Sequence, residues 1–510
     1  NLNAEFAHFM PGNPKVIGRT GTAYIDDFET AKHSFDMKAI SSWYLASTPQ
    51  DYNTSNPLFP ETAQDLGLTY GFNRAKIAWY YIDDNFYVSP PANISADDRS
   101  KPYVRRIFET EFHPNKEIPQ QMQALTVREF NLAFYPSERG PYNFDTTSAY
   151  SAGLMDDGSL RSPETRWGGI MRKLERTDFE EVNIEYIEFW MMDPFIDNPQ
   201  HKGGKLYFNL GDISEDILRD GRKSFENGLP VTAEVIDVDT TIWGRVPRLQ
   251  SIVNAFSNDP TARQYQDVGY DGLSSENEAT FFSRFLTIAQ QQLNQDAYDA
   301  LIADPSADNF MYFRSQHYDE TDAKILERYK RYNSPEGNSS VVSDNSEYSS
   351  QSSSLPNIED INQDNTLSES ESYYEYVLEL TPENMVIGKN YITDIHEARN
   401  VELQNGNTTD CKWYQFKIPV REPDRTVGSI SGFQSIRFMR LFLRDFEEPI
   451  VLRFGTFELV SGEWRKYTDN LLTPGVYPSG NQSENTTFTV ASVNIEENGK
   501  RLPVPYVLPP

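Results

Sequence analysis

Residues 182–217 contain two neighbouring runs in which apolar side chains recur at every second position, and this pattern constrains the fold more than any other stretch. The first run, VNIEYIEFWMM at 182–192, changes phase by one residue after Tyr186. The second run, KLYFNL at 205–210, alternates without interruption. A period of two is typical of a β-strand, and a phase change indicates either a β-bulge or burial on both faces. Pro194 interrupts the pattern, so we predict two strands that face each other across a polar connection.

A second pair of apolar runs lies in residues 435–464, SIRFMRLFLRDFEEPIVLRFGTFELVSGEW. It has the same order as the first pair: an aromatic and aliphatic strand, an acidic break that contains Pro449, and a returning strand. The 29 tyrosines and 31 phenylalanines also favour strands. We therefore predict a mainly β chain with two related antiparallel β-sandwiches of the jelly-roll type.

The composition changes twice between the two predicted sandwiches. Residues 276–302 carry apolar side chains at the spacing of one helix face. Residues 334–356 are rich in Ser and Asn and contain few large apolar groups, as flexible linkers do. The predicted organisation is a first β-sandwich at 1–225, a connecting segment with a helix at 226–333, a flexible linker at 334–358, a second β-sandwich at 359–465 and an extended exit segment at 466–510.

Charge excludes some partners. The chain has 46 basic and 76 acidic residues, a formal net charge of −30, which opposes binding to nucleic acid or anionic lipid and can attract cations. The single cysteine, Cys411, cannot form an internal disulfide, and its apolar surroundings predict burial. No apolar run is long enough to predict a transmembrane helix. Because the sequence begins at Asn1 without a signal peptide, we expect a piece of a longer protein.

The strongest local motif is EDINQDNTLSESE at 359–371, which has the ligand spacing of a twelve-residue calcium loop. Asn365 replaces the glycine of that pattern, although Asn tolerates the left-handed conformation. The flanking helices of the usual motif are not predicted here, so a capped polar turn explains the same residues equally well. The candidate Ca²⁺ ligands are Asp360, Asn362, Asp364, Thr366, Ser368 and Glu371.

A weaker copy of the calcium pattern begins at Asp267, in QDVGYDGLSSENE. Asp271 and Glu278 stand at ligand positions, but Gly269 offers no side-chain ligand. The candidate ligands of this second site are therefore Asp267, Asp271 and Glu278. The acidic group at 26–29 is a third candidate, for which a solvated strand end is the simpler interpretation.

Motifs of known catalytic sites are absent from the sequence. The 6 histidines are scattered, and no HExxH occurs. The stretch GSISG at 428–432 has isoleucine where a nucleophile elbow needs serine. No phosphate-binding or dinucleotide-binding glycine motif is present. We therefore predict that the chain is not an enzyme, and a hydrolase ranks third among the functions considered.

Several long phrases together resemble one family. These phrases are AYIDDFE (23–29), NRAKIAWYYID (73–83), YPSERGPYNF (135–144), IEFWMMDPF (187–195), LYFNLGDISEDI (206–217), FENGLP (225–230), QDVGYDGL (266–273), EDINQDNTL (359–367), IRFMRLFL (436–443), LRFGTFELVSGEWR (452–465) and ENGKRLPVPYVLPP (497–510). Through them the chain resembles, over nearly its whole length, the SprA (or Sov) family, the outer-membrane translocons of the Bacteroidetes type IX secretion system.

The resemblance implies a non-enzymatic, soluble portion of a giant outer-membrane β-barrel that exports folded proteins to the cell surface and supports gliding motility. It implies three kinds of partner: a PorV-like outer-membrane protein, a periplasmic plug protein and secreted cargo proteins. Galactose-binding-like sandwiches would fit both predicted units. The alternative function is a calcium-dependent carbohydrate-binding surface module, for which an exposed aromatic platform would be the distinguishing feature.

Overall fold

The computed structural model describes residues 23–26, 34–50, 57–63, 67–116, 125–249, 254–339, 352–462 and 464–467. The chain divides into two units. One comprises Asn1–Ser34 and Val460–Pro510, and within it strand β1 (Ala23–Asp26) pairs with strand β17 (Trp464–Tyr467). The acidic group at 27–29 and the exit segment beyond residue 467 lie outside the described residues. The other unit, Phe35–Leu459, contains the rest of the described elements.

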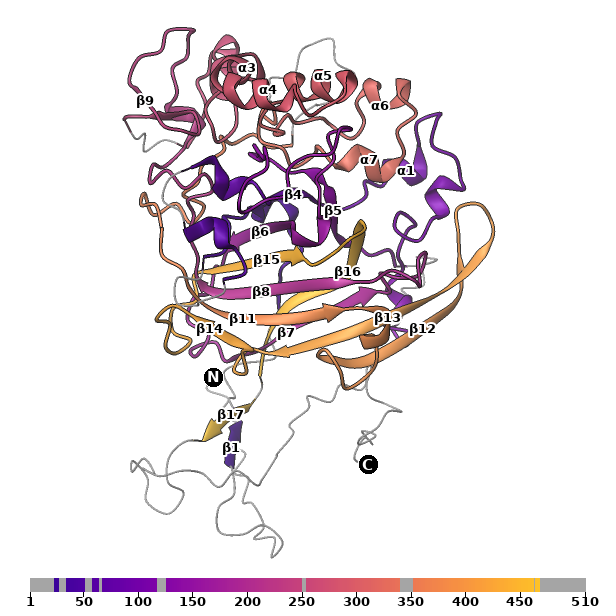
Figure 1. Ribbon diagram of the computed structural model, residues 1–510. Coiled ribbons are helices and arrows are strands. Elements are labelled where there is room, and N and C mark those ends of the chain that lie inside the picture. The colour runs from indigo at the N-terminus through magenta and orange to yellow at the C-terminus, as the bar shows by residue number, and fades with distance from the viewer. Residues whose placement is uncertain are drawn as a thin grey trace, which may run out of the picture. The chain divides into compact units, whose positions relative to one another are not determined.

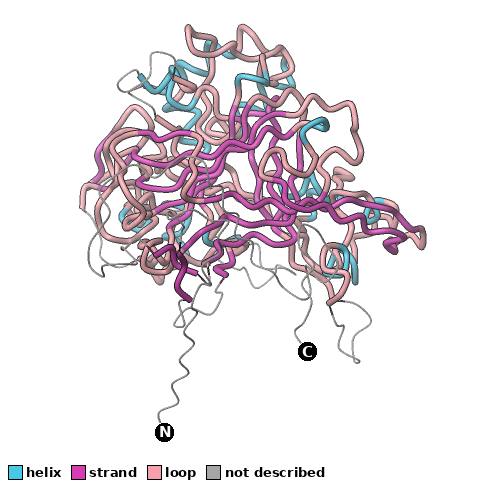
Figure 2. Tube along the Cα trace, turned by 90° about the horizontal axis from the view of Figure 1, so that it is seen from below, coloured by secondary structure: helices cyan, strands magenta, loops and turns pink. Residues whose placement is uncertain are grey.

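The unit Phe35–Leu459 is built on two antiparallel sheets, so the predicted mainly β sandwich class is confirmed (Figures 1 and 2). Figure 2 shows the strands crossing the centre, with loops and short helices around them. The 6-stranded sheet has the order β14 (Arg425–Val427), β11 (Ser372–Leu380), β8 (Gly204–Asp212), β15 (Phe438–Arg444), β6 (Trp167–Lys173) and β3 (Tyr44–Leu45). The 7-stranded sheet has the order β12 (Ile392–Glu402), β13 (Thr408–Pro419), β7 (Ile184–Met192), β16 (Ile450–Ser461), β5 (Phe130–Arg139) and β4 (Ala75–Tyr80), and β2 (Ser34–Asp36) pairs with β16.

Each sheet contains strands from both halves of the chain, with one strand of the second half inserted between two of the first, which corrects the prediction of two separate sandwiches. β8 lies between β11 and β15, and β7 lies between β13 and β16. The two strands of each predicted pair are in opposite sheets, so the polar segments at 193–203 and 445–449 cross from one sheet to the other. The sequence pattern shows which face of a strand is apolar, but it does not show which strand lies beside it.

The phase change in β7 results from burial on both faces. Phe189 lies in the core between the sheets, where its ring centroid is 4.7 Å from that of Phe416 and 5.8 Å from that of Phe208 in the opposite sheet. Trp190 and Met192 belong to a second apolar cluster with residues of the loop at 103–112. The pairing of β7 with β13 has no register shift, so no bulge is needed to explain the pattern.

Short helices occupy the segment between β10 and β11, where one helix at 276–302 was predicted. Figure 1 shows α3 to α7 on the side of the sandwich next to β4 and β5. Tyr329 of α7 stacks on Tyr80 of β4, with ring centroids 4.3 Å apart. The helices are α1 (Asn85–Val88), α2 (Arg263–Gln266), α3 (Ser275–Phe281), α4 (Ser283–Ala289), α5 (Gln295–Ala303), α6 (Gln316–Glu320) and α7 (Ile325–Tyr329), and strands β9 (Val238–Thr240) and β10 (Arg245–Pro247) precede α2 as a separate pair.

The amino-terminal end of the predicted flexible linker is packed against the rest of the unit, whereas Leu355 near its other end is 52% exposed. Ser334, Asn338 and Ser339 are buried. The backbone N–H of Ser339 donates to Asp267 Oδ2 at 3.0 Å, and Asn338 Nδ2 donates to Asn357 Oδ1 at 2.8 Å. Residues 340–351 lie outside the described residues, so the prediction of a flexible linker is corrected for residues 334–339 alone.

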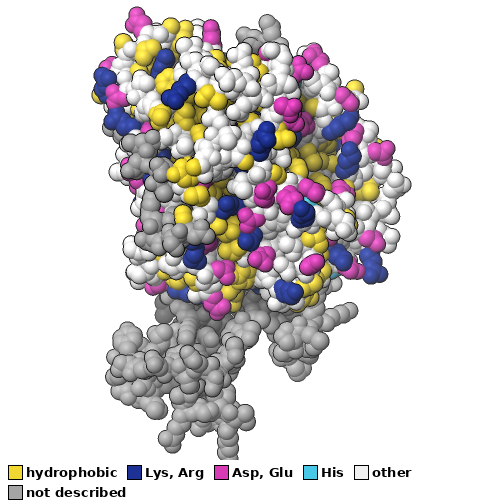
Figure 3. All heavy atoms as spheres, viewed as in Figure 1, with side chains coloured by type: hydrophobic (Ala, Val, Ile, Leu, Met, Phe, Trp, Pro, Cys, Tyr) yellow, Lys and Arg dark blue, Asp and Glu magenta, His cyan; other side chains and the backbone are white. Residues whose placement is uncertain are grey.

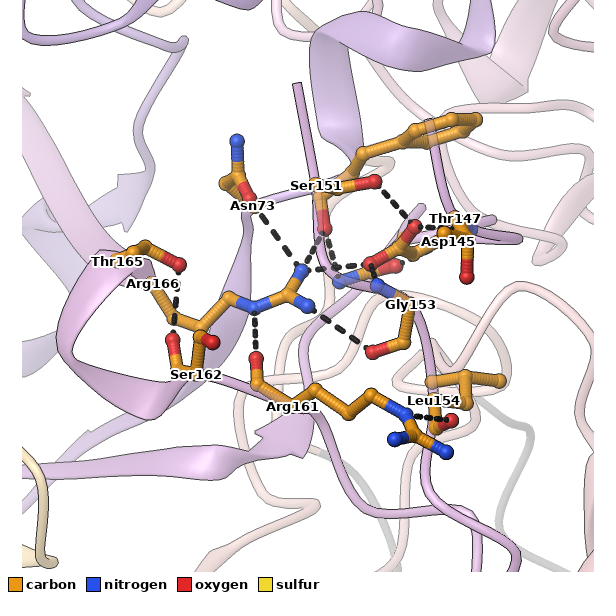
Figure 4. Close-up of polar contacts among 12 residues, drawn as sticks. Asn73, Asp145, Thr147, Ser151, Gly153, Leu154, Arg161, Ser162, Thr165 and Arg166 are labelled. Carbon is orange, nitrogen blue, oxygen red and sulfur yellow. Dashed lines mark hydrogen bonds and ion pairs between the residues drawn. The ribbon is translucent and has the colours of Figure 1, made fainter. Parts of the chain in front are cut away.

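Buried ion pairs join distant parts of this unit. Arg166 Nη1 lies 2.7 Å from Asp145 Oδ2, and both side chains are fully buried. Figure 4 shows the Arg166 guanidinium among Asn73, Asp145 and the carbonyl of Gly153, which it contacts at 3.3, 2.7 and 3.0 Å. These contacts fix the start of β6 to the loop that follows β5, because a buried guanidinium needs hydrogen-bond acceptors on every side.

Candidate metal centre

The first predicted calcium loop forms a turn whose leading ligand already has partners. Asp360 Oδ1 accepts the N–H of Asp364 at 3.0 Å, and its Oδ2 accepts the N–H of Asn365 at 2.8 Å. Lys223 Nζ lies 3.4 Å from Asp360 Oδ2, and both side chains are buried. Asn365 has a φ of 68°, the left-handed conformation expected of the residue in the glycine position. The loop therefore has the backbone of a capped turn and a lysine as its counter-charge.

The last predicted ligand of that loop belongs to a different site. Glu371 forms a buried bidentate ion pair with Arg440 of β15. Its Oε1 also accepts the backbone N–H of Ser214 at 3.2 Å. The structure therefore does not bring the predicted set together around one point, because its two end carboxylates are each engaged by a cation. Calcium binding by Asp360, Asn362, Asp364, Thr366, Ser368 and Glu371 therefore stays a prediction that these contacts do not favour.

Two of the three ligands of the weaker calcium pattern do come together. Asp271 lies in the loop before α3, and Glu278 lies within α3. They meet Asp308, from the loop after α5, so that one oxygen of each carboxylate lies within 4.8 Å of the others. Within the described ranges this is the one such group of acidic, histidine or cysteine side chains. All three residues are buried: the exposed fraction is 1% for Asp271 and 0% for Glu278 and Asp308.

Hydrogen bonds hold the three carboxylates in place and leave two oxygens without a partner. Ser306 Oγ donates to Asp271 Oδ2 at 2.7 Å, and its backbone N–H donates to Glu278 Oε2 at 2.8 Å. Tyr142 donates its hydroxyl to Asp308 Oδ2 at 2.7 Å. Glu278 Oε1 and Asp308 Oδ1 have no hydrogen-bond partner among the described residues. Buried polar atoms are normally paired, so these two oxygens indicate a missing ligand.

Gly269 makes room for this arrangement. Its φ is 73°, and a Cβ added there would lie 2.4 Å from Asp308 Oδ2 and 2.9 Å from the Tyr142 hydroxyl. A side chain at this position would therefore push apart the hydrogen bond that orients Asp308. The weaker calcium pattern places no side-chain ligand at Gly269. In the structure, the missing side chain leaves the space that the Asp308 carboxylate occupies.

Asp267, the remaining predicted ligand, is not part of the cluster. Its Oδ2 accepts the N–H of Ser339, and its negative charge acts on the buried carboxyl of Glu226. Glu226 accepts the backbone N–H groups of Val268, Gly269 and Asn357. Asp308 takes the place of Asp267, and no spacing rule could have identified it, because the chain folds through three helices before it reaches the site.

Burial makes the ionised form of the three carboxyls costly. It raises the pKa of Asp271 well above its usual range, and the charge of Asp308 raises it further. Burial likewise raises the pKa of Asp308, with a second contribution from Glu278. The pKa of Glu278 is raised by burial and then by Asp271. No Lys or Arg forms an ion pair with any of the three among the described residues, so a cation or protons must compensate their charge.

The aromatic side chains are mostly buried, which bears on the carbohydrate-binding alternative. Among the described residues, the exposed large apolar side chains include one aromatic, Tyr265, with 36% of its surface exposed. A cavity of about 540 Å³ is lined by Tyr44, Trp79 and Tyr81 among others. The guanidinium of Arg128 lies over the Tyr81 ring at 4.2 Å. Most aromatic side chains of the described residues therefore lie in the core, and Tyr44, Trp79 and Tyr81 gather at this cavity.

The described residues show no other feature that defines an activity. Cys411 is buried as predicted, and burial raises the pKa of its thiol to about 12. Acidic and basic side chains are interspersed on the face seen in Figure 3. Among the described helices, none combines the length and the apolar character that a membrane crossing requires.

Residues 284–510 match the model of the SprA_N family, which is described as a motility related/secretion protein. The match covers less than half of the chain and agrees, over that part, with the resemblance predicted from the sequence. A secretion-related family fits a protein of the cell envelope. A search of curated proteins returned no match.

Proposed function

We propose that the chain is a non-enzymatic portion of an outer-membrane translocon that exports folded proteins to the cell surface in type IX secretion and gliding motility. The observation that carries this proposal is the match of residues 284–510 to the motility related/secretion family. The interleaved sandwich supports a scaffold role, because its aromatic side chains fill the core rather than a binding surface. The partners expected of such a portion are a PorV-like outer-membrane protein, a periplasmic plug protein and the secreted cargo.

The proposal is tested in cells that carry core variants of the full-length protein. Phe189 and Phe438 are fully buried, so Phe189→Ala or Phe438→Ala should unfold the sandwich in part of the population. Export of several unrelated cargo proteins should fall together, while the PorV-like partner still accumulates. The matched control is Val88→Ala, at a side chain that is 76% exposed.

The measurement is the amount of each cargo protein on the cell surface, with the abundance of the variant determined in parallel. Loss of one cargo and retention of the others would contradict a general translocon role and indicate an adaptor for that cargo. Unchanged export by cells in which the variant sandwich is unfolded would also overturn the proposal. Loss of all export on Glu→Gln exchange at one exposed carboxylate, with fold and partners intact, would instead indicate chemistry at that residue.

A further inference from the structure

The three buried carboxylates of Asp271, Glu278 and Asp308 each place one oxygen in a group whose members all lie within 4.8 Å of one another. Glu278 Oε1 and Asp308 Oδ1 have no hydrogen-bond partner among the described residues. Buried polar atoms are normally paired, so two unpaired oxygens in one buried carboxylate cluster call for a compensating ligand.

The same spacing suits a cation placed between the oxygens. Ca²⁺ binds oxygen ligands at about 2.3–2.6 Å, so two ligands on opposite sides of the ion are close to 5 Å apart. Mg²⁺ needs about 2.0–2.1 Å and keeps several waters, which a fully buried cluster does not favour. The side chains offer oxygen atoms and no nitrogen or sulfur, which disfavours Zn²⁺ and Cu²⁺.

We propose that Asp271, Glu278 and Asp308 bind one Ca²⁺ ion, and that this ion fastens the helical segment between β10 and β11 to the β-sandwich. Glu278 Oε1 and Asp308 Oδ1, which have no hydrogen-bond partner among the described residues, would bind the ion. The ligands come from the loop before α3, from α3 itself and from the loop after α5, so one ion connects pieces that are far apart in the chain.

Tyr142 links this centre to the sandwich. It lies in the loop after β5, and its backbone N–H donates to the carbonyl of Ser306 at 2.7 Å. Its hydroxyl donates to Asp308 Oδ2 and accepts the backbone N–H of Tyr270 at 2.8 Å. An ion that fixes Asp308 therefore also fixes Tyr142. The ordering of the helical segment and its attachment to β5 should depend on Ca²⁺ together.

The first experiment is calorimetric titration of the 510-residue chain, stripped of metal with a chelator, with CaCl₂. The parent chain should show saturable binding heat, and MgCl₂ at the same concentration should compete poorly. Glu278→Gln and Asp308→Asn should each weaken Ca²⁺ binding by at least about tenfold, since each removes a ligand charge in a buried site. The matched controls are Asp364→Asn in the first predicted calcium loop and Asp267→Asn, which should bind as the parent does.

The second experiment separates loss of binding from loss of folding. Ca²⁺ should raise the unfolding temperature of the parent and slow proteolysis within residues 263–336, because a ligand of the folded state stabilises it. Glu278→Gln replaces a buried carboxyl, whose ionised form is costly there, by a neutral amide of the same size, so its metal-free unfolding temperature should be no lower than that of the parent. That variant should no longer respond to Ca²⁺. A folded variant without the response supports the proposal.

Terbium offers a readout in the unmodified chain. Tb³⁺ in this centre would lie beside the Tyr142 ring, so excitation of tyrosine should produce terbium emission that Ca²⁺ displaces. The proposal is overturned by three results: no heat and no stabilisation of the parent at millimolar Ca²⁺, binding that survives both Glu278→Gln and Asp308→Asn, or binding that Asp364→Asn abolishes. The last result would place the ion in the loop at 360–371.

Discussion

Arg440 and Glu371 form a bidentate ion pair, with Nη1–Oε1 and Nη2–Oε2 distances of 2.8 Å each and both side chains fully buried. Arg440 lies on the same face of β15 as Phe438 and Phe442, opposite to the face that packs in the core between the sheets. The pair joins β15 to the residue just before β11. Arg440 Nε also donates to Asn209 Oδ1 of β8, at 2.9 Å. Three segments that lie far apart in the sequence thus converge on one guanidinium.

Removing one member of this pair should destabilise the protein strongly. Arg440→Met keeps most of the side-chain volume but leaves Glu371 as an uncompensated buried charge, at an expected cost of about 3–5 kcal/mol. Lys101→Met, which breaks the surface pair with Asp98, should cost no more than about 1 kcal/mol. Urea unfolding measures both values, with and without Ca²⁺. Equal effects of the two variants, or an effect of Arg440→Met that depends on Ca²⁺, would contradict the assignment of Glu371 to Arg440.

Cleavage between the two halves of the chain should not separate them. A specific protease site inserted between residues 345 and 346 would cut the chain after β10 and before β11. Because β11 pairs with β8 and β13 pairs with β7, the fragments should stay together in size-exclusion chromatography and come apart in denaturant. Two independently folded fragments that elute separately without denaturant would support two sandwiches and contradict the observed topology.

The core between the sheets should be sensitive to loss of aromatic volume. Phe189→Ala removes a fully buried ring that stacks on Phe416, and the expected cost is about 3–5 kcal/mol. Val88→Ala, at an exposed side chain, should change stability by less than about 0.5 kcal/mol. Chemical denaturation monitored by tryptophan fluorescence gives both numbers. A cost below about 1 kcal/mol for Phe189→Ala would mean that this ring is not part of the core.

Glu61 should make stability fall as pH rises. Burial raises its pKa from 4.5 to about 7 in the folded protein, so the folded state holds the proton more tightly than the unfolded state does. The contribution of Glu61 to the free energy of unfolding is complete below pH 4.5 and is lost as pH rises through 7. At 1.36 kcal/mol per unit of pKa difference, this contribution amounts to about 3 kcal/mol.

The test compares the pH dependence of unfolding free energy in the parent and in Glu61→Gln. Subtracting the two curves isolates Glu61 from the other buried acids. The difference should grow between pH 4.5 and 7 in favour of the variant and stay constant above. A flat difference across this window would show that the carboxyl is solvated or paired.

The sequence pattern was sufficient to locate the central strands but not to arrange them. β7, β8, β15 and β16 fall within the predicted apolar runs, because alternation reflects which side chains face the core. Their partners depend on how the polar segments at 193–203 and 445–449 cross between sheets, and a crossing has the same composition as a hairpin turn. Residues 103–112 form turns and the 3-10 helix Glu109–Glu111, and Ile107 and Phe112 of this segment pack on the outside of β7.

The candidate ligands show a similar limit. Spacing alone favoured the loop at 360–371, yet Glu371 is used by Arg440. One signal for this was present: Arg440 stands in the middle of the apolar run IRFMRLFL, and an arginine buried in a strand needs an acidic partner. Asp308 had no comparable signal, because its position beside Asp271 and Glu278 arises from the packing of α3 to α5 and not from local sequence.

The interleaving of strands has a consequence for how the chain reaches its native state. Each sheet places strands from the carboxyl-terminal half between or beside strands from the amino-terminal half, and β16 completes the 7-stranded sheet. A chain made or delivered amino terminus first exposes the edges of β5, β7 and β8 until β11, β13, β15 and β16 arrive. Closure must await nearly the whole of Phe35–Leu459, and contacts of such high sequence separation form slowly. During that interval the unfinished sheets present open hydrogen-bonding edges, at which another chain can pair before the native strand arrives.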